Sequence, residues 1–485
     1  MKLGKLEVIV LVSGAVVMVV EILGSRIVAP FFGSSLYVWT SLIGVVMASL
    51  SLGYFLGGRV SRKDPSFKTI SLIFFTASLL VALLAVFKDA VLFLFTGTGI
   101  KIGSLAVSAI LFGPVSVLLG AISPIAVRIK TEKAEEAGAE SGALYAISTF
   151  GSIVGTFLAG FFLIPSFGIT FILGLMSFVL FSLSLLAFSG PKKTAALRTL
   201  VIIVPLLLLA APVWGQGKYV YSGESSYASI RVQDSTFEGR PVRYLIMDTE
   251  FHSAIYLDTF EPVFDYVKFY RHDKNIYSNI KGGLIIGGGT GVAAMDFSRR
   301  FPEARVDIVE IDPKVSRLGE KYFGYKESPQ RVLYNEDART FLRKAQALGT
   351  KYDVIYGDAF RSYYSVPYNL TTLEAIKNMY NILNDDGFVM VNVISSLEGE
   401  KSDFFLSELK TYKQVFARVV AYHLSTQSGP NSTQNIMLVA LKKDVSPETL
   451  GIQGEYFLPR DLRHSPVLTD DYAPVEYFIS KLVVN

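Results

Sequence analysis

The sequence contains no cysteine and little charge, and each of these shortages excludes a class of protein. Without a thiol the chain forms no disulfide, has no cysteine nucleophile and cannot bind zinc or an iron–sulfur cluster through sulfur. Only 18% of its residues are charged, against about 25% in ordinary soluble domains. Hydrophobic residues make up 51%. Intrinsic disorder and a secreted disulfide scaffold are therefore excluded.

The shortage of charge is confined to the first part of the chain. Residues 1–217 hold 15 of the 46 Lys+Arg and 8 of the 42 Asp+Glu, which leaves 31 and 34 for residues 218–485. The net charge is therefore +7 on the first part and −3 on the second. This division predicts a transmembrane domain over 1–217 and a soluble part long enough to bury its own core. The acidic balance of the soluble part argues against a nucleic-acid partner.

The first part contains seven apolar runs, and a helix of roughly 20 such residues crosses the core of a bilayer. The seventh run is the shortest, and Pro205 and Pro212 interrupt it. We therefore predict a multispan α-helical bundle of about seven helices in the cell membrane. The runs lie at 7–28, 37–58, 69–87, 104–127, 142–164, 169–189 and 199–214.

The distribution of Lys and Arg among the loops predicts the orientation of the bundle. Twelve of these residues fall on the side of the N-terminus and only Arg26, Lys88 and Lys101 on the other, so the N-terminus is expected in the cytoplasm. Seven crossings would place the soluble part outside the cell. If the seventh run does not cross, the soluble part stays in the cytoplasm, and the sequence leaves this choice open.

The soluble part divides into two patterns. Residues 218–280 contain short alternating strands that predict a small antiparallel β-subdomain. Residues 281–485 alternate apolar strands with helical stretches, which predicts an α/β domain with a doubly wound, mostly parallel sheet covered on both faces. Such sheets bind ligands at the carboxyl ends of their strands. The predicted strands of this domain are 283–287, 306–312, one within 331–339, 352–360 and 387–394.

A glycine-rich loop follows the first of these strands. Gly287, Gly289 and Gly291, with Thr290 between the last two, let the backbone approach a ligand closely where a helix begins. Glu310 ends the next strand, 21 residues after Gly289, where a carboxylate can accept both hydroxyls of a ribose. We therefore predict a nucleoside site here.

Two further acids follow the third and fourth strands. Asp337, before Ala338, either accepts from an adenine amino group or caps the following helix. Asp358 is placed to act as a general base toward an incoming amine, because an ammonium has no lone pair with which to attack carbon. The next loop contains Arg361 and Tyr363 and is rich in tyrosine, so it is a candidate to close over a ligand.

The chain resembles a membrane-fused member of the spermidine synthases, the polyamine aminopropyltransferases. The soluble part matches in ESSYASIRV (224–232), IIGGGTG, VEID, NEDAR and YDVIYGDAF. The first part is similar to the multispan region of membrane-fused members in ILGSRIVAPFFGSS, VWTSLIGVVMASLSLGYFLGGRVS and GALYAISTFGSIVGTFLAGFFLIPSFG.

The resemblance implies an S-adenosylmethionine-methyltransferase-like fold and transfer of an aminopropyl group from decarboxylated S-adenosylmethionine to putrescine. The products would be spermidine and methylthioadenosine, with no tightly bound cofactor and no metal. By that likeness Glu310 binds the ribose, Asp337 the adenine, and Asp358 accepts the proton. Tyr227 would contact the donor, and Tyr266, Arg361 and Tyr363 the amine. A homodimer is implied by the resemblance alone.

Three positions depart from the family's pattern. Thr290 stands where the family's GGGDG loop has the Asp that holds the donor's amine, Arg361 replaces a second acid, and Ala228 replaces a Gln. The departures keep two alternatives open. One is an S-adenosylmethionine-dependent methyltransferase acting on a membrane-associated acceptor. The other is a sensor or transporter that binds an adenosyl ligand without catalysis.

Overall fold

The computed structural model describes residues 4–33, 35–131, 133–188, 203, 219–359, 366–424, 429–452, 454–457 and 461–482. The chain forms two compact units. The first comprises Met1–Lys218 and Gly223–Ser229, and the second Tyr219–Ser222 and Ile230–Asn485.

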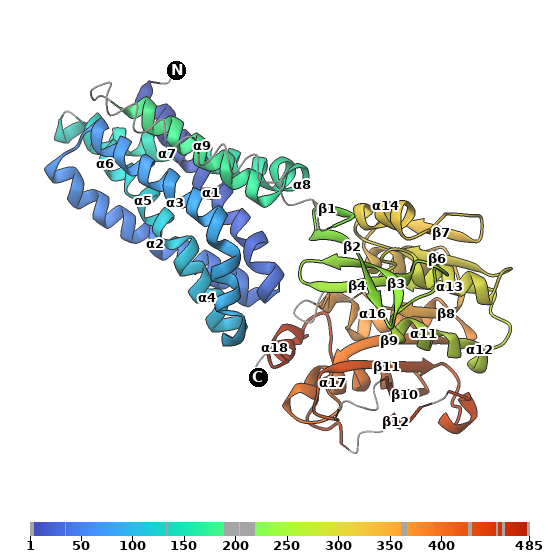
Figure 1. The fold of residues 1–485 in the computed structure, drawn as a ribbon. Coiled ribbons are helices and arrows are strands. Elements are labelled where there is room, and N and C mark those ends of the chain that lie inside the picture. Colours follow the sequence, from blue (N-terminus) through green and yellow to red (C-terminus); the bar gives the residue numbers. More distant parts are fainter. Residues whose placement is uncertain are drawn as a thin grey trace. The chain divides into compact units, whose positions relative to one another are not determined.

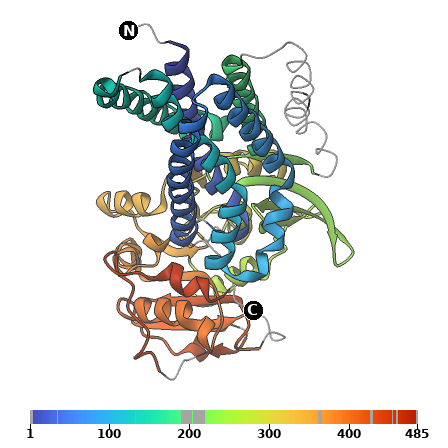
Figure 2. The same cartoon turned by 90° about the vertical axis from the view of Figure 1, so that its left-hand side faces the viewer.

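The first unit is a bundle of long apolar helices that lie alongside one another in each view (Figures 1 and 2). Within the described residues, six helical segments are long and apolar enough to cross a membrane. The elements are α1 Lys5–Phe32, α2 Leu36–Lys63, α3 Phe67–Leu94, η1 Thr96–Thr98, α4 Ile100–Leu111, α5 Gly113–Gly120, α6 Ile122–Lys130, η2 Ala134–Glu136, α7 Ala137–Phe157, the π-helical turn η3 Leu158–Leu163, α8 Ile164–Ser166 and α9 Ile169–Ala187.

These helices account for six of the seven predicted runs. The seventh run, 199–214, falls outside the described residues except at position 203. The run at 104–127 is divided among α4, α5 and α6, with interruptions at Phe112 and Ala121. Pro114 lies in the first turn of α5, where its missing N–H is tolerated.

Small residues allow the helices of the bundle to pack closely. A Cβ added to Gly151 of α7 would lie 2.0 Å from the Leu11 carbonyl oxygen of α1, so only glycine fits this contact. Helices α3 and α9 are joined by reciprocal bonds. Ser78 Oγ donates to the Ser177 carbonyl oxygen at 2.7 Å, and Ser177 Oγ returns the bond to Ser78 at 2.8 Å. Both patterns are typical of helix association without a hydrophobic driving force.

The second unit begins with a four-stranded antiparallel sheet in the order β1-β2-β3-β4. It has one strand more than the three that the segments SYASIRVQD, VRYLIMD and SAIYLD predict, because β1 precedes them. A tight turn at Glu238 and Gly239, both with positive φ, joins β2 to β3. The strands are β1 Tyr221–Glu224, β2 Ser229–Phe237, β3 Arg240–Met247 and β4 Glu250–Tyr256.

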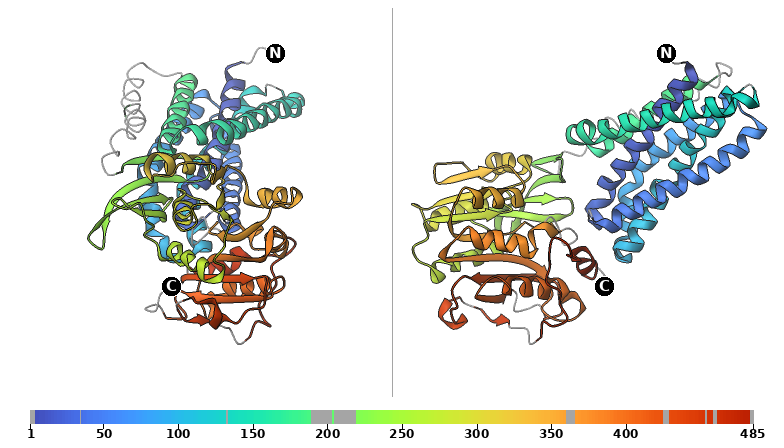
Figure 3. Two further views of the ribbon diagram at one scale, coloured as in Figure 1. Left: turned by 90° about the vertical axis from the view of Figure 1, so that its right-hand side faces the viewer. Right: turned by 180° about the vertical axis from the view of Figure 1, so that it is seen from behind.

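An eight-stranded sheet follows, in the order β12-β10-β11-β9-β8-β5-β6-β7 (Figures 1 and 3). The pairs among β5 to β9 are parallel, as predicted, whereas β9–β11, β11–β10 and β10–β12 are antiparallel. The sheet is therefore mixed. Its strands are β5 Gly282–Ile286, β6 Arg305–Val309, β7 Arg331–Tyr334, β8 Tyr352–Gly357, β9 Leu383–Ser395, β10 Arg418–His423, β11 Gln434–Leu441 and β12 Tyr456–Phe457.

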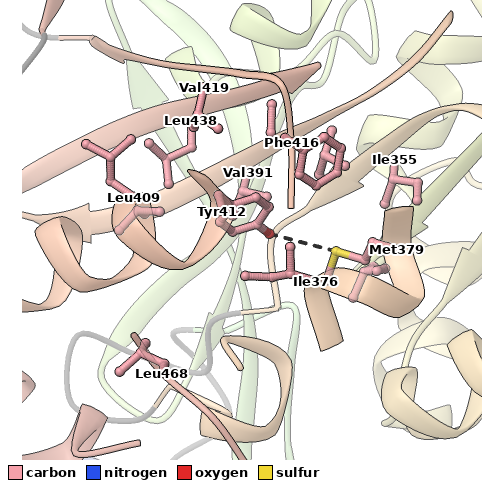
Figure 4. Packing of buried hydrophobic residues seen from close by; sticks show 14 of the residues in the cluster. Ile355, Ile376, Met379, Val391, Leu409, Tyr412, Phe416, Val419, Leu438 and Leu468 are labelled. Carbon is pink, nitrogen blue, oxygen red and sulfur yellow. Dashed lines mark hydrogen bonds between the residues drawn. The ribbon is translucent and has the colours of Figure 1, made fainter. Parts of the chain in front are cut away.

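Helices cover both faces of this sheet. Aliphatic side chains of α15, α16 and α17 pack on one face around β8, β9 and β11, and Tyr412 Oη reaches Met379 Sδ at 3.8 Å (Figure 4). On the other face Tyr356 of β8 contacts the rings of Tyr270 and Phe297. The helices are α11 Asp265–Phe269, η6 Tyr270–His272, α12 Asp273–Ile276, α13 Val292–Arg300, α14 Pro313–Tyr322, α15 Ala338–Ala347, η7 Tyr368–Leu370, α16 Leu373–Asn381, η8 Glu400–Ser402, α17 Asp403–Lys413, η9 Pro447–Leu450 and α18 Val475–Ser480.

Candidate active site

The strand order brings four predicted site segments to one edge of the large sheet. The glycine loop follows β5, Glu310 follows β6, Asp337 follows β7 and Asp358 follows β8. Because β8, β5, β6 and β7 are parallel neighbours in that order, their carboxyl ends lie side by side. This edge is where doubly wound sheets bind their ligands.

The glycine loop requires glycine at two of its turns. Gly287 and Gly291 have φ angles of 82° and 79°, in the left-handed region that side chains disfavour. A Cβ on Gly287 would lie 2.4 Å from the carbonyl oxygen of Asp358, and one on Gly291 would lie 2.3 Å from the ring of Tyr325. The loop backbone therefore runs directly against the end of β8 before α13 begins.

Glu310 holds the glycine loop against the end of β6. Its Oε2 accepts from the backbone N–H of Gly289 at 2.8 Å, and its Oε1 accepts from that of Asp312 at 2.9 Å. Burial raises the pKa of the Glu310 carboxyl to about 7, although these two backbone bonds act in the opposite direction. Each carboxylate oxygen keeps a further lone pair, so binding of ribose hydroxyls stays a prediction that this geometry permits.

Thr290 is part of the loop, between Gly289 and Gly291. It is 1% exposed, and its hydroxyl has no hydrogen-bond partner among the described residues. Its backbone lies against α14, because a Cβ on Gly319 would approach the Thr290 carbonyl oxygen to 2.6 Å.

Asp337 caps a helix, which is one of the two roles considered for it. Its Oδ1 accepts from the backbone N–H of Thr340 at 2.9 Å, at the start of α15. Ala338 is the first residue of that helix, beside the end of β7. A cap that uses one carboxylate oxygen is compatible with an adenine contact through the other, and that contact stays a prediction.

Asp358 directly follows β8 and is partly buried. Its Oδ1 accepts from Asn392 Nδ2 of β9 at 3.1 Å. Burial raises the pKa of the Asp358 carboxyl to about 7, and hydrogen bonds from Asn392 and Tyr266 act against this increase. A carboxyl with such a pKa is half ionised near neutral pH and can both accept and release a proton there.

Tyr266 faces Asp358 from α11. Its hydroxyl donates to the His252 carbonyl oxygen at 3.4 Å and lowers the pKa of the Asp358 carboxyl against the effect of burial. Burial, followed by the charge of Asp358, raises the pKa of Tyr266 well above its ordinary value. Tyr266 therefore stays protonated and can act as a hydrogen-bond donor.

The roles of the three remaining predicted contacts stay predictions. Tyr227 lies in Gly223–Ser229, which belongs to the first compact unit, and its role stays a prediction. Arg361 and Tyr363 fall outside the described residues.

Two asparagines at the site were missed in the sequence. Asn392, on β9, contacts Asp358, and its position in the apolar run VMVNVI is a signal that could have identified it. Asn335 ties the ends of β6 and β7 together, because its Nδ2 donates to Ser316 Oγ at 2.7 Å and to the Glu310 carbonyl oxygen at 3.2 Å.

The fold and the residues at this edge of the sheet define the class of the protein. A parallel β7-β6-β5-β8-β9 core, extended by antiparallel β11 and β10, with a glycine loop after its first strand, is a methyltransferase-like α/β domain. Residues 271–448 match the family model described as the spermine/spermidine synthase domain.

Curated relatives carry the same family name. A polyamine aminopropyltransferase of Lachnospira eligens is 30% identical over 216 residues, which are 43% of this chain and 72% of that protein. One of Vibrio vulnificus is 34% identical over 146 residues, 30% of this chain and only 47% of that protein. Polyamine aminopropyltransferase 2 of Aquifex aeolicus is 23% identical over 406 residues, 79% of this chain and 77% of that protein.

The chain therefore belongs to the spermidine synthase family, and it is a transferase of the aminopropyltransferase type. The similarity to the Aquifex aeolicus protein covers 79% of the chain and so extends into the helical unit.

Proposed function

We propose that this chain transfers the aminopropyl group of decarboxylated S-adenosylmethionine to an amine such as putrescine. The products are methylthioadenosine and spermidine. The glycine loop and Glu310 bind the nucleoside of the donor, and Asp337 contacts the adenine. Family membership supports the reaction class, and the choice of donor and acceptor is our proposal.

Asp358 is the observation that carries this proposal. It lies at the carboxyl end of β8, with its backbone against Gly287 of the glycine loop, and its carboxyl has a pKa of about 7. A free amine nitrogen attacks the aminopropyl carbon that bears the sulfonium, the C–S bond breaks, and neutral methylthioadenosine leaves. The proton lost by the nitrogen goes to Asp358. Most of the catalysis is then alignment of the two substrates and removal of this proton.

The test uses purified full-length protein in detergent with decarboxylated S-adenosylmethionine and putrescine, and mass spectrometry of the products. We expect methylthioadenosine and spermidine in equal amounts. Asp358→Asn keeps the shape but cannot accept the proton, so turnover should fall roughly 10²–10⁴-fold. Asp353→Asn is a matched control, because Asp353 lies on the same strand β8 and its carboxylate binds the backbone N–H groups of Lys281 and Gly282. Equal losses in both variants would contradict the role of Asp358.

One observation favours a second candidate function, methyl transfer from intact S-adenosylmethionine to a membrane-associated acceptor. Thr290 provides a buried neutral hydroxyl where the family pattern has an acid for the donor's amine. Incubation with S-adenosylmethionine and membrane extract distinguishes the two reactions. S-adenosylhomocysteine as the product would support methyl transfer and contradict the aminopropyl proposal. An adenosyl ligand that binds without turnover in either assay would instead support the non-catalytic sensor.

We also propose that the helical unit is inserted in the cell membrane as a multi-pass bundle with a cytoplasmic N-terminus. The length and apolar character of the six described segments support insertion, and the excess of Lys and Arg on one side supports the orientation. A homodimer of the soluble unit is proposed from the family resemblance.

A further inference from the structure

Asn392 is a polar residue in the apolar centre of the large sheet. It lies in β9 between Val391 and Val393 and is 2% exposed. In the parallel pairing of β8 with β9, Gly357 is opposite Val391, so the next residues along the two strands, Asp358 and Asn392, lie beside each other. The strand register thus places an amide directly against the proposed base.

The orientation of the Asn392 amide follows from its partner. The Nδ2 of Asn392 faces Asp358 and donates to Oδ1 at 3.1 Å, the arrangement that an ionised carboxylate requires because it only accepts hydrogen bonds. The amide oxygen is consequently turned away from Asp358. This oxygen is buried and has no hydrogen-bond partner among the residues that the structure describes.

An unpaired buried carbonyl oxygen reduces the stability of the folded chain. An apolar residue of the same size would avoid that cost, as its neighbours Val391 and Val393 do. Residues that break such a local rule are expected at functional sites, where the gain is in chemistry rather than in stability. Among the described residues, the one hydrogen bond that offsets the cost of burying the Asn392 amide is its bond to Asp358.

We propose that Asn392 is a positioning residue of the transfer reaction, whose amide holds the Asp358 carboxylate ionised and in a fixed orientation toward the acceptor nitrogen. This inference rests on the proposed function, in which Asp358 is the base. Among the described residues, the titratable groups that interact with the charge of Asp358 are Tyr266 and Tyr270. Burial and the charge of Asp358 raise the pKa of both phenols well above the ordinary value, so both stay neutral throughout the assay.

The same pair of strands provides a matched control. Asn384 of β9 donates from Nδ2 to Asp353 Oδ1 of β8 at 2.6 Å, near the opposite end of the two strands. Asp353 also accepts from the backbone N–H groups of Lys281 and Gly282. Asn384 therefore makes the same type of bond to an aspartate that holds the fold and lies away from the glycine loop.

The experiment compares Asn392→Leu with Asn384→Leu in the full-length protein, measuring kcat/KM for the amine against pH and the thermal midpoint of each variant. Loss of the amide donor raises the pKa of Asp358. In Asn392→Leu we expect the midpoint of the pH profile to move upward by about one unit, so that activity below pH 7 falls about tenfold and recovers at high pH. Its thermal midpoint should not fall, and the KM for the donor should not change. Asn384→Leu should show the reverse, with reduced stability and an unshifted profile.

A second variant keeps the test decisive if leucine disturbs folding. Asn392→Asp retains the shape but places two carboxyl groups in contact, so the profile should again move upward. An unshifted profile in both Asn392 variants, or a loss of activity that is equal at every pH, would overturn the inference. If the wild-type protein forms no transfer product with either donor, it is the proposed function that fails, so the two failures are distinguishable.

Discussion

Burial raises the pKa of both the Asp358 and the Glu310 carboxyl to about 7, but their hydrogen-bond partners suit them to different roles. The oxygens of Glu310 bind backbone N–H groups of the glycine loop and of Asp312, which makes it part of the frame of the site. Asp358 instead accepts a hydrogen bond from a side chain, Asn392, and its pKa also responds to the Tyr266 hydroxyl. Side chains can adjust as a proton arrives, whereas backbone donors are fixed by the strand ends. Asp358 is therefore the better candidate for the base.

The pKa of Asp358 predicts how turnover depends on pH. A base must be ionised to act, and burial raises the pKa of this group from 3.8 to about 7. We expect kcat/KM to increase about tenfold per pH unit below 7 and to level off above it, apart from the ionisation of the amine itself. The measurement is a pH series at constant ionic strength with the donor saturating. A profile that is level from pH 5 to 7 would show that Asp358 does not gate the reaction.

For single residues, the sequence predicted which side chains lie at the site better than it predicted the contacts that they make. The sequence was sufficient to place Glu310 and Asp358 at the ligand-binding edge of the sheet. Each is an acid at the end of an apolar strand in a β–α repeat, and the ends of such strands lie at that edge. The cap formed by Asp337 is a local contact, and the sequence named it as one of two roles, whereas the bond from Asn392 to Asp358 depends on spacing in three dimensions. The bond from Asn392 to Asp358 exists because of the register between β8 and β9, and the sequence of neither strand predicts that register.

The glycine loop is the element on which the nucleoside site depends. Gly291 has a φ of 79°, and a Cβ there would overlap the ring of Tyr325 at 2.3 Å. Gly291→Ala therefore combines backbone strain of about 1–3 kcal/mol with a steric clash. We expect a lower thermal midpoint together with a higher KM for the donor, measured on the same preparation.

A substitution at Gly349 separates the effect of backbone strain from that of the steric clash. Its φ of 68° is also left-handed, but a Cβ there would meet nothing within 4 Å. Gly349→Ala should therefore show the strain alone, with a smaller loss of stability and an unchanged KM. If both variants behaved alike, the contact between the loop and Tyr325 would not matter.

Helix α17 contains a buried acid that the proposed reaction does not use. Glu408 is 3% exposed, its Oε2 has no partner among the described residues, and burial raises the pKa of its carboxyl from 4.5 to about 8. As the pH rises, Glu408 ionises in the unfolded chain before it does so in the folded chain. Its contribution to the free energy of unfolding is therefore complete below pH 4.5 and is lost as the pH rises toward 8. The loss is at most about 1.4 kcal/mol per pH unit.

Glu408→Gln removes this titration. We expect hydrogen exchange of the α17 amides to accelerate with pH less steeply in the variant than in the wild type, after correction for intrinsic exchange. At pH 8 the variant should be the more protected protein. The exposed Glu400, just before α17, gives the control Glu400→Gln, which should leave the slope unchanged. Equal slopes in all three proteins would mean that Glu408 ionises in the folded state.

The sequence predicted helices and strands correctly where a single pattern of apolar residues extends over the whole segment. The long apolar helices and the parallel strands β5 to β9 follow from length and apolar content alone. The division of 104–127 into three helices depends on packing as well as on Pro114 and Pro124. The antiparallel strands β10, β11 and β12 were not anticipated, because pairing between residues distant in the sequence decides them.

For the whole molecule, the proposed insertion in a membrane gives the soluble unit one of two sides. Six crossings return the chain to the side of the N-terminus, and a seventh over 199–214 would reverse the outcome. We expect six, and therefore a cytoplasmic soluble unit, because adenosyl co-substrates are made in the cytosol. The excess of Lys and Arg then places residues 59–68 in the cytoplasm as well.

Because the chain has no cysteine, a single introduced thiol reports this topology without background. Leu348 is 81% exposed at the end of α15, so Leu348→Cys presents a reactive thiol on the soluble unit. In intact cells we expect an impermeant maleimide to label Gly97→Cys, between α3 and α4, but neither Leu348→Cys nor Lys63→Cys. Once the cells are permeabilised, it should label all three variants. Labelling of Leu348→Cys in intact cells, with Lys63→Cys still protected, would show that the seventh run crosses. The donor would then have to come from outside the cytosol, and the aminopropyl proposal would lose its source of co-substrate.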